Sequence, residues 1–490
     1  MDTTKYETVI GMEIHAELRT ASKMFCGCAV VDTTVTEPNT AICPVCTGLP
    51  GAMPVVNQHA MEQAMRVGLA LNCQINAFTS FARKNYFYPD LPKGYQISQF
   101  DHPLATHGWV EVLTDTGETV RVGIHRAHME EDTAKSYHVP AHEDGVDAYT
   151  LIDFNRSGVP LLEIVSEPDM HSVAAAHAYA MKIREILRYL GVNSGDMEKG
   201  VLRFEANISI RPRGSKMLGT RTEVKNLNSF RALVRAAEYE ITRQIQAVEA
   251  GQTIVQETLG WDENRGVTYS QRSKEQAHDY RYFPEPDLPP LLIDEAWVEE
   301  VRATLPELPD AKYARFVEAY GLPENDARIL VSERALAGYF ERAAAAYAGR
   351  PVEVSKLIVG QLAYLMNQEG IGIDEVRVAP EAIAKLVTLL DAGTLNQTGA
   401  KDVLTAMFET GKSPEEIVKE KGLIQISDED QLAHFADEVL DENPDQVAAY
   451  LDGKESVLQW FMGQVMRKTR GRAKPQTVLQ QLREKLETRR

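Results

Sequence analysis

The sequence predicts an α+β protein: a mostly antiparallel sheet with helices comes first, and two all-helical domains follow. Strand-like alternation and many glycine, proline and aromatic residues continue to about residue 292, and from Asp294 the pattern is almost wholly helical. Strands and helices mix without a regular βαβ rhythm, which favours an antiparallel sheet. A chain of 490 residues is too long for one hydrophobic core. We therefore expect domains at residues 1–293, 294–408 and 409–490.

Periodicity predicts the elements of the first domain. Alternating residues predict strands, two of them joined through a turn at Asp115-Thr116-Gly117. Apolar residues at helical spacing predict helices, with Gly191 and Gly251 placed as C-caps. The strands are expected in 7–18, 110–132, 161–169, 204–215 and 220–226, and the helices in 57–71, 172–191 and 229–251.

The later domains are predicted from composition. Prolines between Pro284 and Pro290 indicate an extended segment at the end of the first domain. Helical patterns follow in 297–305, 309–321 and 325–348, and a smaller helical unit opens near residues 410–422. That last unit is large enough only for a small bundle.

Bulk properties indicate a soluble protein of the cytoplasm. Apolar residues make up 44% and charged residues 25%, the N-terminus lacks the pattern of a signal peptide, and no apolar run is long enough to span a membrane. The net charge of −19 argues against non-specific binding to DNA or other nucleic acids. Residues 451–490 nevertheless carry about +6 and residues 413–450 about −9, which fits either a solvated helix face or a basic binding surface.

Four of the five cysteines have the spacing of a closed zinc site. Cys26 and Cys28 form C-x-C, and Cys43 and Cys46 form C-x-x-C. Disulfides or buried free thiols are the alternatives, but disulfides require an exported chain. Four thiolates leave no open position for a substrate, so the zinc is expected to be structural. Cys73 stands alone and is expected to be a small buried hydrophobe.

Acidic residues on strands are the candidate chemical groups. Glu13, His15 and Glu17 share one face of a strand and can hold a divalent ion or carry solvated charge. The acidic run that contains Glu130 follows two histidines and is also compatible with a solvated turn. Glu205 and Glu223 are two further strand carboxylates. Carboxylates that converge from several strands with one imidazole would suit Mg²⁺.

Residues 82–99 combine two lysines and an arginine with four aromatic residues and two prolines. Such a loop can neutralise phosphates and stack a base, or it can be a packed aromatic loop. The common nucleotide-binding signatures are missing: Gly411-Lys412-Ser413 resembles the end of a P-loop, but Ala406 stands where its first glycine belongs.

Together these segments resemble the B subunit of the glutamyl/aspartyl-tRNA amidotransferases. The matching stretches include GMEIHAEL, CPVCTGLPGAMPVVN, ARKNYFYPDLPKGYQISQ, HMEEDTAKS, DFNRSGVPLLEIVSEPD, EANISIRP, GTRTEVKNLNSF, HDYRYFPEPDLPP and MGQVMRKTRGRAKP, in family order. The resemblance implies a cradle domain, a helical domain and a small tail domain resembling YqeY.

The resemblance also implies an activity. A protein of this family binds Glu-tRNA(Gln) or Asp-tRNA(Asn), and with ATP and Mg²⁺ it phosphorylates the side-chain carboxylate. An amidase A subunit supplies ammonia through a channel, ammonia displaces the phosphate, and a small C subunit holds the A and B subunits together. Which product is made depends on the mischarged tRNAs present in the cell.

Residue roles are implied in the same way. Mg²⁺ or its water shell would be held by Glu13, His15, Glu130, Glu205 and Glu223. ATP and the aminoacyl end would be held by Lys84, Tyr86, Lys93, Gln96 and Ser98. Phosphates of the tRNA body would be contacted by Arg467, Lys468, Arg470, Arg472 and Lys474. The family commonly has Asp at the position of Glu205, so a ligand at this position reaches one methylene further.

Three other functions are less consistent with the sequence. The archaeal E subunit of the Gln-specific enzyme shares the cradle but carries a large inserted domain for which this chain has no room. A non-catalytic tRNA-binding scaffold has no need for acids facing a phosphate-binding surface. A free-standing zinc hydrolase conflicts with a closed four-cysteine site.

Overall fold

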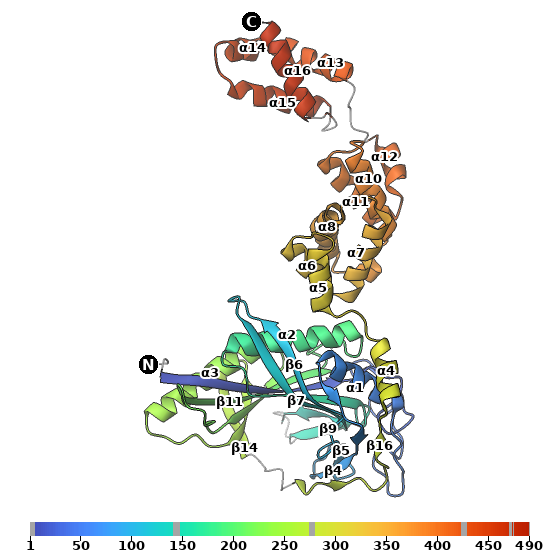
Figure 1. Ribbon diagram of the computed structural model, residues 1–490, viewed down its shortest axis with the longest axis vertical. Helices are drawn as coiled ribbons and strands as arrows, with labels where there is room; N and C mark the ends of the chain where they lie inside the picture. The colour runs from blue at the N-terminus through green and yellow to red at the C-terminus, as the bar shows by residue number, and fades with distance from the viewer. Residues whose placement is uncertain are drawn as a thin grey trace. The chain divides into compact units, whose positions relative to one another are not determined.

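The computed structural model describes residues 5–140, 148–273, 280–422, 429–469, 473 and 475–489 (Figure 1). Its chain divides into two compact units, Met1–Leu308 and Pro309–Arg490. The first unit holds all the strands of the described residues, and the second is helical. The predicted α+β class is confirmed.

One twelve-stranded sheet forms the first unit. Its pairs are antiparallel except for one parallel pair, β12 with β13. In sheet order its strands are β14 (Val267–Ser273), β13 (Glu257–Asp262), β12 (Thr222–Leu227), β11 (Leu202–Pro212), β1 (Tyr6–Glu17), β10 (Pro160–Ser166), β7 (Thr119–Glu131), β5 (Tyr95–Ser98), β4 (Ala82–Asn85) and β15 (Phe283–Pro284), with β6 (Ala105–Leu113) joining β7 and β2 (Gln74–Ile75) joining β6.

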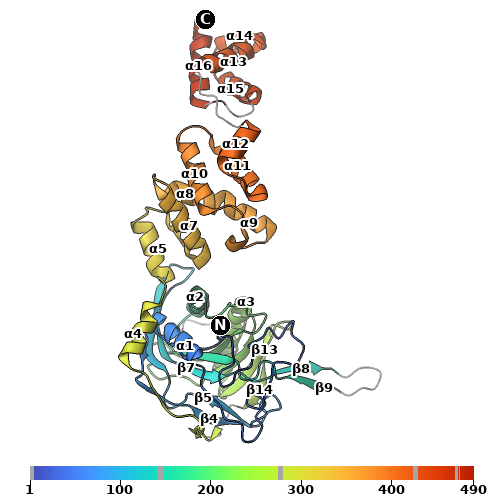
Figure 2. The same cartoon turned by 90° about the vertical axis from the view of Figure 1, so that its right-hand side faces the viewer.

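Two short strand pairs complete this unit. The first joins β3 (Phe78–Thr79) to β16 (Leu291–Leu292). The second joins β8 (Lys135–Val139) to β9 (Tyr149–Asp153), and this hairpin extends away from the body of the unit (Figure 2).

Helices cover one face of the sheet and leave the other face polar. The helices are α1 (Gln58–Ala70), α2 (Val173–Leu190) and α3 (Phe230–Glu249), and Figure 1 shows α2 and α3 along the same side. Met12 and Ile14 of β1 are buried beneath them in the main core. Because strand side chains alternate, Glu13 and His15 face the opposite side, as predicted.

The caps of α2 follow the sequence signals. Ser172 accepts a hydrogen bond from the Ala175 amide at the start, and Gly191 ends the helix in the left-handed conformation at φ 73°. In α3 the cap residue is Ala250, and Gly251 follows it at φ 71°.

The first unit extends beyond the predicted boundary at residue 293. Helix α4 (Glu295–Ala303) follows it, and its Val301 is buried in the core of the sheet domain. Arg66 of α1 donates to the hydroxyl of Thr304 at 2.9 Å, directly after α4. Packing thus assigns this helix to the first unit, whose limit is Leu308.

The second unit contains two separate hydrophobic cores. The first core extends to Ile417 and Val418 of α12, so the segment 409–421 packs with the preceding helices. It is built by α5 (Pro309–Glu318), α6 (Glu324–Val331), α7 (Arg334–Ala346), α8 (Pro351–Leu357), a π-helical turn (Ile358–Leu362), α9 (Ala363–Glu369), a 3₁₀ turn (Ile373–Glu375), α10 (Pro380–Asp391), α11 (Gln397–Thr410) and α12 (Pro414–Lys421). The second core is built by α13 (Glu429–Asp441), α14 (Pro444–Leu451), α15 (Ser456–Lys468) and α16 (Pro475–Thr488).

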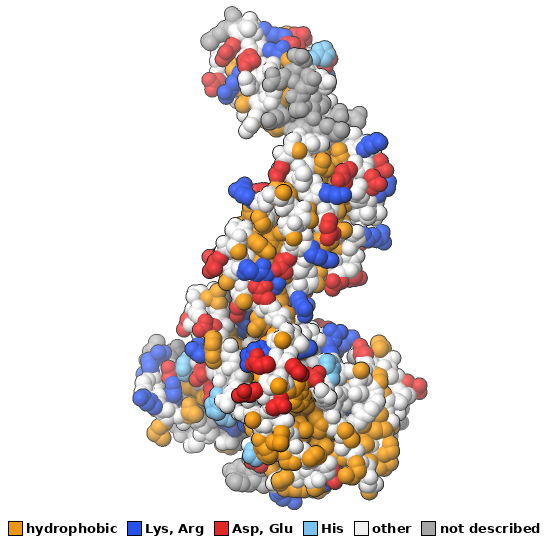
Figure 3. All heavy atoms as spheres, turned by 45° about the vertical axis from the view of Figure 1, so that its right-hand side comes forward, with side chains coloured by type: hydrophobic (Ala, Val, Ile, Leu, Met, Phe, Trp, Pro, Cys, Tyr) orange, Lys and Arg blue, Asp and Glu red, His pale blue; other side chains and the backbone are white. Residues whose placement is uncertain are grey.

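None of the helices in the described part of the chain is long and apolar enough to cross a membrane. Hydrophobic side chains gather on one face of the first unit, in the lower part of Figure 3. Apolar patches of this kind are frequent where a partner protein binds.

Candidate active site and candidate metal centre

The polar face of the sheet brings acids together because adjacent strands pair in register. Glu13 of β1 lies opposite Glu205 of β11, and His15 lies opposite Glu163 of β10. Glu163 in turn pairs with His128 of β7, and Asn207 pairs with Glu223 of β12. Two groups of titratable side chains result.

The first group surrounds His15. Its Nε2 atom lies 3.4 Å from Glu163 Oε2 and 3.9 Å from Glu130 Oε1. His128 Nε2 lies 3.5 Å from the same Glu163 oxygen, and Arg126 donates to the His128 ring at 3.4 Å. These side chains are buried or nearly so, so their charges interact strongly.

The second group surrounds Glu13. Asn207 donates to Glu13 Oε1 at 2.9 Å, and Thr258 donates to Glu223 Oε2 at 2.9 Å. Lys225 Nζ lies 2.8 Å from Glu205 Oε2 and 4.0 Å from Glu223 Oε1. One lysine is thus shared by two of the three carboxylates.

Both groups line a single cavity of about 390 Å³. Lys84 and Ser98, predicted to hold ATP or the aminoacyl end, lie in the same wall. Phe100 and Tyr282 stack there with ring centroids 4.0 Å apart. The remaining lining residues are Arg126, Arg221, Gln256, Thr258 and Tyr280.

Crowding shifts the pKa values in this cavity. Burial, with the charges of Glu163 and Glu205, raises the pKa of Glu13. Burial and Glu163 raise the pKa of Glu130 to about 7. Burial opposes the charged form of His15, but the hydrogen bond to Glu163 and the charges of nearby carboxylates together outweigh this cost and raise the pKa of His15 to about 9. Carboxylates this close together raise one another's pKa values, and a bound cation would relieve their repulsion.

The donor atoms fit a divalent metal ion. Two separate sets of side chains could each hold an ion, because the ligand atoms within each set lie within 4.8 Å of one another. One set is His15, Glu130 and Glu163, and the other is Glu13, Glu205 and Glu223. The second set offers only oxygen atoms, which Mg²⁺ prefers. Within the described chain, Glu130 Oε2 and Asn207 Oδ1 are buried without a hydrogen-bond partner. All five predicted Mg²⁺ ligands therefore reach one cavity, and their role as ligands stays a prediction.

Three of the predicted ATP or aminoacyl-end residues lie outside this cavity. Gln96 is buried and donates to the backbone carbonyl of Glu131 at 2.7 Å. Lys93 forms an ion pair with the Glu131 carboxylate and lines a second cavity. Tyr86 packs against Tyr280, with ring centroids 6.1 Å apart. Their proposed contacts with ATP or the aminoacyl end stay predictions.

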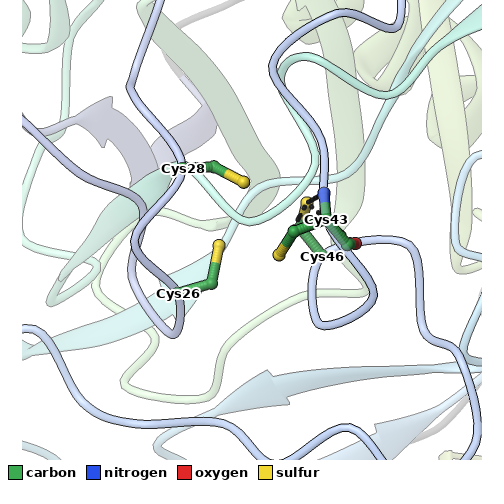
Figure 4. A group of neighbouring side chains, drawn as sticks. All are labelled: Cys26, Cys28, Cys43 and Cys46. Atoms are coloured by element: carbon green, nitrogen blue, oxygen red, sulfur yellow. Dashed lines mark hydrogen bonds between the residues drawn. The ribbon is translucent and has the colours of Figure 1, made fainter.

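The four clustered cysteines converge from two loops. Their sulfur atoms lie within 4.8 Å of one another and point toward a common centre (Figure 4). The Cys43 amide donates to Cys46 Sγ at 3.2 Å. A hydrogen bond from Cys26 lowers the pKa of Cys46 to about 4, against the cost of burial. Four clustered sulfurs, one of them held as a thiolate, suit a tetrahedral zinc ion.

A buried lysine lies beside this cluster. Lys23 has no exposed surface, and its Nζ atom lies 2.8 Å from the Ala41 carbonyl and 3.5 Å from Cys46 Sγ. The Phe154 carbonyl accepts a third hydrogen bond at 3.3 Å. A buried ammonium requires a nearby negative charge, and the thiolates can supply it.

Two of the five basic residues predicted to bind the tRNA body lie at the end of α15. Arg467 and Lys468 are exposed there. Lys468 already pairs with Glu438 and Glu442, each at 2.7 Å. Arg470, Arg472 and Lys474 lie outside the described residues.

Several residues that line the cavity were not predicted from the sequence. Glu163 and Lys225 are the most central, and His128 and Arg126 extend the set. A single acid inside the apolar strand PLLEIVS, and a lysine two residues after Glu223, were the available signals. Both signals become informative only once the strand partners are known.

Comparison with known proteins places the chain in one family. The family model described as the GatB/GatE catalytic domain matches residues 8–299, and the GatB domain matches residues 338–486. Proteins named as the B subunit of aspartyl/glutamyl-tRNA(Asn/Gln) amidotransferase are similar over almost the whole chain. In Moorella thermoacetica identity is 53%, covering 98% of this chain and 100% of the relative. The relatives from Carboxydothermus hydrogenoformans and Thermodesulfovibrio yellowstonii are 51% and 49% identical, over 98% and 97% of this chain and 99% and 98% of theirs.

Proposed function

Because the chain belongs to the B-subunit family of the aspartyl/glutamyl-tRNA(Asn/Gln) amidotransferases, we propose that its cavity activates the side-chain carboxylate of Glu-tRNA(Gln), Asp-tRNA(Asn) or both. The observation that carries this proposal is the convergence of acids, lysines and two imidazoles in a single cavity. A scaffold that only binds tRNA has no use for buried acids at this position.

The chemistry requires an activated carboxylate. An oxygen of the substrate carboxylate attacks the γ-phosphorus of ATP, ADP leaves, and an acyl phosphate forms. Ammonia then attacks the acyl carbon, phosphate leaves, and the amide remains. The proton that ammonia loses passes to a base, and the carboxylates of the cavity are the bases within reach.

Residues of this chain would position the reactants and balance their charge. Lys84 and Arg126 line the cavity and can neutralise phosphate oxygens during transfer. The charge of Glu130 helps to raise the pKa of Lys84, although burial opposes it, so this lysine is held as a cation. A largely buried site also protects an acyl phosphate from water.

Magnesium and zinc would have different roles. Glu13, Glu205 and Glu223, or His15 with Glu130 and Glu163, would hold Mg²⁺, which neutralises phosphate charge when bound. The four cysteines would hold a structural zinc ion that fixes two loops of the first unit.

Partner subunits complete the proposed reaction. The relatives are named as subunits, which implies partners in the assembly. We expect an amidase A subunit to supply ammonia through an internal channel and a small C subunit to join the A and B subunits. The apolar face of the first unit in Figure 3 is a surface that such a partner could cover.

Phosphate release without an amide donor tests the activation step. The complex with its A and C subunits is incubated with Glu-tRNA(Gln), γ-labelled ATP and Mg²⁺, using wild type, Glu13→Gln and the control Glu111→Gln. Glu111 lies exposed on β6 and outside the cavity. Release is expected to require mischarged tRNA and to fall at least about a hundredfold in Glu13→Gln only, because metal-site carboxylates are seldom replaceable.

Two other outcomes have distinct meanings. Equal release from all three proteins would remove Glu13 from the essential set and leave the other carboxylates as ligands. No release from any of them, in a complex with intact glutaminase activity, would favour the tRNA-binding scaffold.

A further inference from the structure

A basic segment connects two strands of the active-site sheet. Residues 206–222 contain Arg211, Arg213, Lys216 and Arg221 and no acidic residue, in a chain with a net charge of −19. Arg211 pairs with Glu7 at 2.6 Å, and Lys216 and Arg221 lie in the connection between β11 and β12. This concentration of positive charge favours a polyanionic ligand.

The connection is firmly built. A Cβ atom on Gly219 would lie 2.1 Å from the Ile210 carbonyl oxygen, so the loop backbone rests directly on the end of β11. The Arg213 amide donates to the Lys5 carbonyl at 2.9 Å, and Gly214 makes the turn at φ +85°. Thr222, where β12 begins, is fully buried. Packing and backbone hydrogen bonds therefore hold both ends of the loop.

Two apolar side chains project from this loop. Met217 is 81% exposed and Leu218 is 60% exposed, which places them among the most exposed large hydrophobic residues in the described chain. Solvated apolar side chains between basic residues match a ligand that offers both phosphates and flat apolar surfaces. Single-stranded nucleic acid has this combination of groups.

The loop is continuous with the cavity. Arg221 lines the cavity at the end of the loop, and Glu223 and Lys225 of β12 line it two and four residues later. Cationic side chains therefore follow one strand from the carboxylate cluster outward. An amino acid held in the cavity would remain attached to an RNA that leaves along this path.

We propose that residues 213–221 bind the single-stranded 3′-terminal nucleotides of the aminoacyl-tRNA, with Lys216 and Arg221 on phosphates and Met217 and Leu218 against base faces. The proposal rests on the function proposed above, because only an aminoacyl-tRNA links an amino acid in the cavity to RNA outside it. An acidic protein segment would match the charge but leave the two apolar side chains without a partner.

Steady-state kinetics of the complete complex test this surface. The variant carries Met217→Ser and Leu218→Ser, and the control carries Leu113→Ser at the exposed end of β6. The KM for Glu-tRNA(Gln) is expected to rise about tenfold in the double variant alone, because contacts between bases and apolar side chains are lost. The KM for ATP and the glutaminase rate should stay at wild-type values, which shows that the protein is folded and assembled.

Charge and position are tested separately. Lys216→Gln should lower the salt dependence of tRNA binding by about 0.7 in log-log slope. A tRNA with a photoreactive base among its 3′-terminal unpaired nucleotides should crosslink to the peptide that contains residues 213–221. An unchanged KM in the double variant, or crosslinks only to other segments, overturns the proposal. Phosphate release by the wild-type complex, measured in the same series, tests the activation step independently of the loop.

Discussion

Lys23 shows how a single side chain responds to the cysteine cluster. Its ammonium is fully buried, and Cys46 Sγ lies 3.5 Å away. Carbonyl oxygens alone compensate a buried charge poorly, whereas a tetrathiolate zinc site carries a net charge of −2. The lysine would reduce this excess negative charge.

Replacing Lys23 should weaken zinc binding. We expect Lys23→Met to lower zinc affinity about tenfold or more, because charged groups just outside the ligand set tune metal affinity. Competition with a chromogenic chelator measures this, and Lys199→Met is the matched control, since Lys199 pairs with Asp32 on the surface. Equal affinities in the two variants would contradict this role.

Arg83 and Glu285 form a buried ion pair. Two hydrogen bonds of 2.7 Å join them, and the Glu285 side chain has no exposed surface. The Arg83 guanidinium also lies 4.1 Å from the centre of the Tyr95 ring. This pair holds the short strand β15 against β4, beside the segment that carries Tyr280 and Tyr282.

Glu285→Gln should destabilise the first unit by about 3 kcal/mol, because it removes one charge of a buried pair. Glu299→Gln, which affects an exposed pair with Arg302 in α4, should change stability by less than about 0.5 kcal/mol. Urea unfolding of both variants measures the difference. Equal midpoints would show that the buried pair contributes no net stability.

At the scale of elements, the end of α15 carries the proposed contact with the tRNA body. Lys468 is held by two carboxylates, Glu438 of α13 and Glu442 directly after it, whereas Arg467 one residue earlier is exposed. An RNA phosphate must compete with Glu438 and Glu442 for Lys468. The two adjacent cations should therefore contribute unequally.

Neutralising the tail should weaken tRNA binding in a salt-dependent manner. Changing Arg467, Lys468, Arg470, Arg472 and Lys474 to Gln is expected to raise the KM for charged tRNA and flatten its dependence on salt, because fewer counterions are released on binding. Arg467→Gln alone should have a larger effect than Lys468→Gln. Measuring the KM at several salt concentrations tests both expectations. An unchanged salt dependence in the variant with all five substitutions would refute the assignment.

At the scale of the whole molecule, three separate cores divide the chain. The last core, built by α13 to α16, is small, and a core of its size supplies only about 3–5 kcal/mol. Unfolding of the chain is therefore not expected to be a single two-state transition.

A cavity in the last core should unfold it locally. Phe461 is fully buried there, and Phe461→Ala costs about 3–5 kcal/mol, which is comparable to the stability of this core. Hydrogen exchange should show lost protection in residues 429–489 and unchanged protection in β1 and β10. The exposed neighbour Gln459→Ala is the control. Uniform loss of protection along the chain would show that the cores unfold together.

Much of the candidate site was accessible from residue spacing. The four cysteines were identified because C-x-C and C-x-x-C loops are local chelators. Glu13 and His15 were placed on one face because strand side chains alternate. The assignment of the five acidic and imidazole ligands additionally drew on family resemblance, and the structure brings all five to one cavity.

Long-range pairing decided the rest. The central strands are ordered β11, β1, β10 and β7, so segments far apart in the chain lie side by side, and no local pattern encodes this order. This order brings Glu163 against His15, and the pairing of β12 with β11 brings Lys225 against Glu205. Local packing turns Lys93 and Gln96 toward Glu131. The sequence alone determined the long central strands, the helices and which cysteines cluster, because these depend on neighbours in the chain. Strands β4 and β5 lie in residues 82–99, which were expected to form a loop. Only the tertiary structure decided which charges meet, because that depends on which strands pair, and β1 pairs with strands more than a hundred residues away.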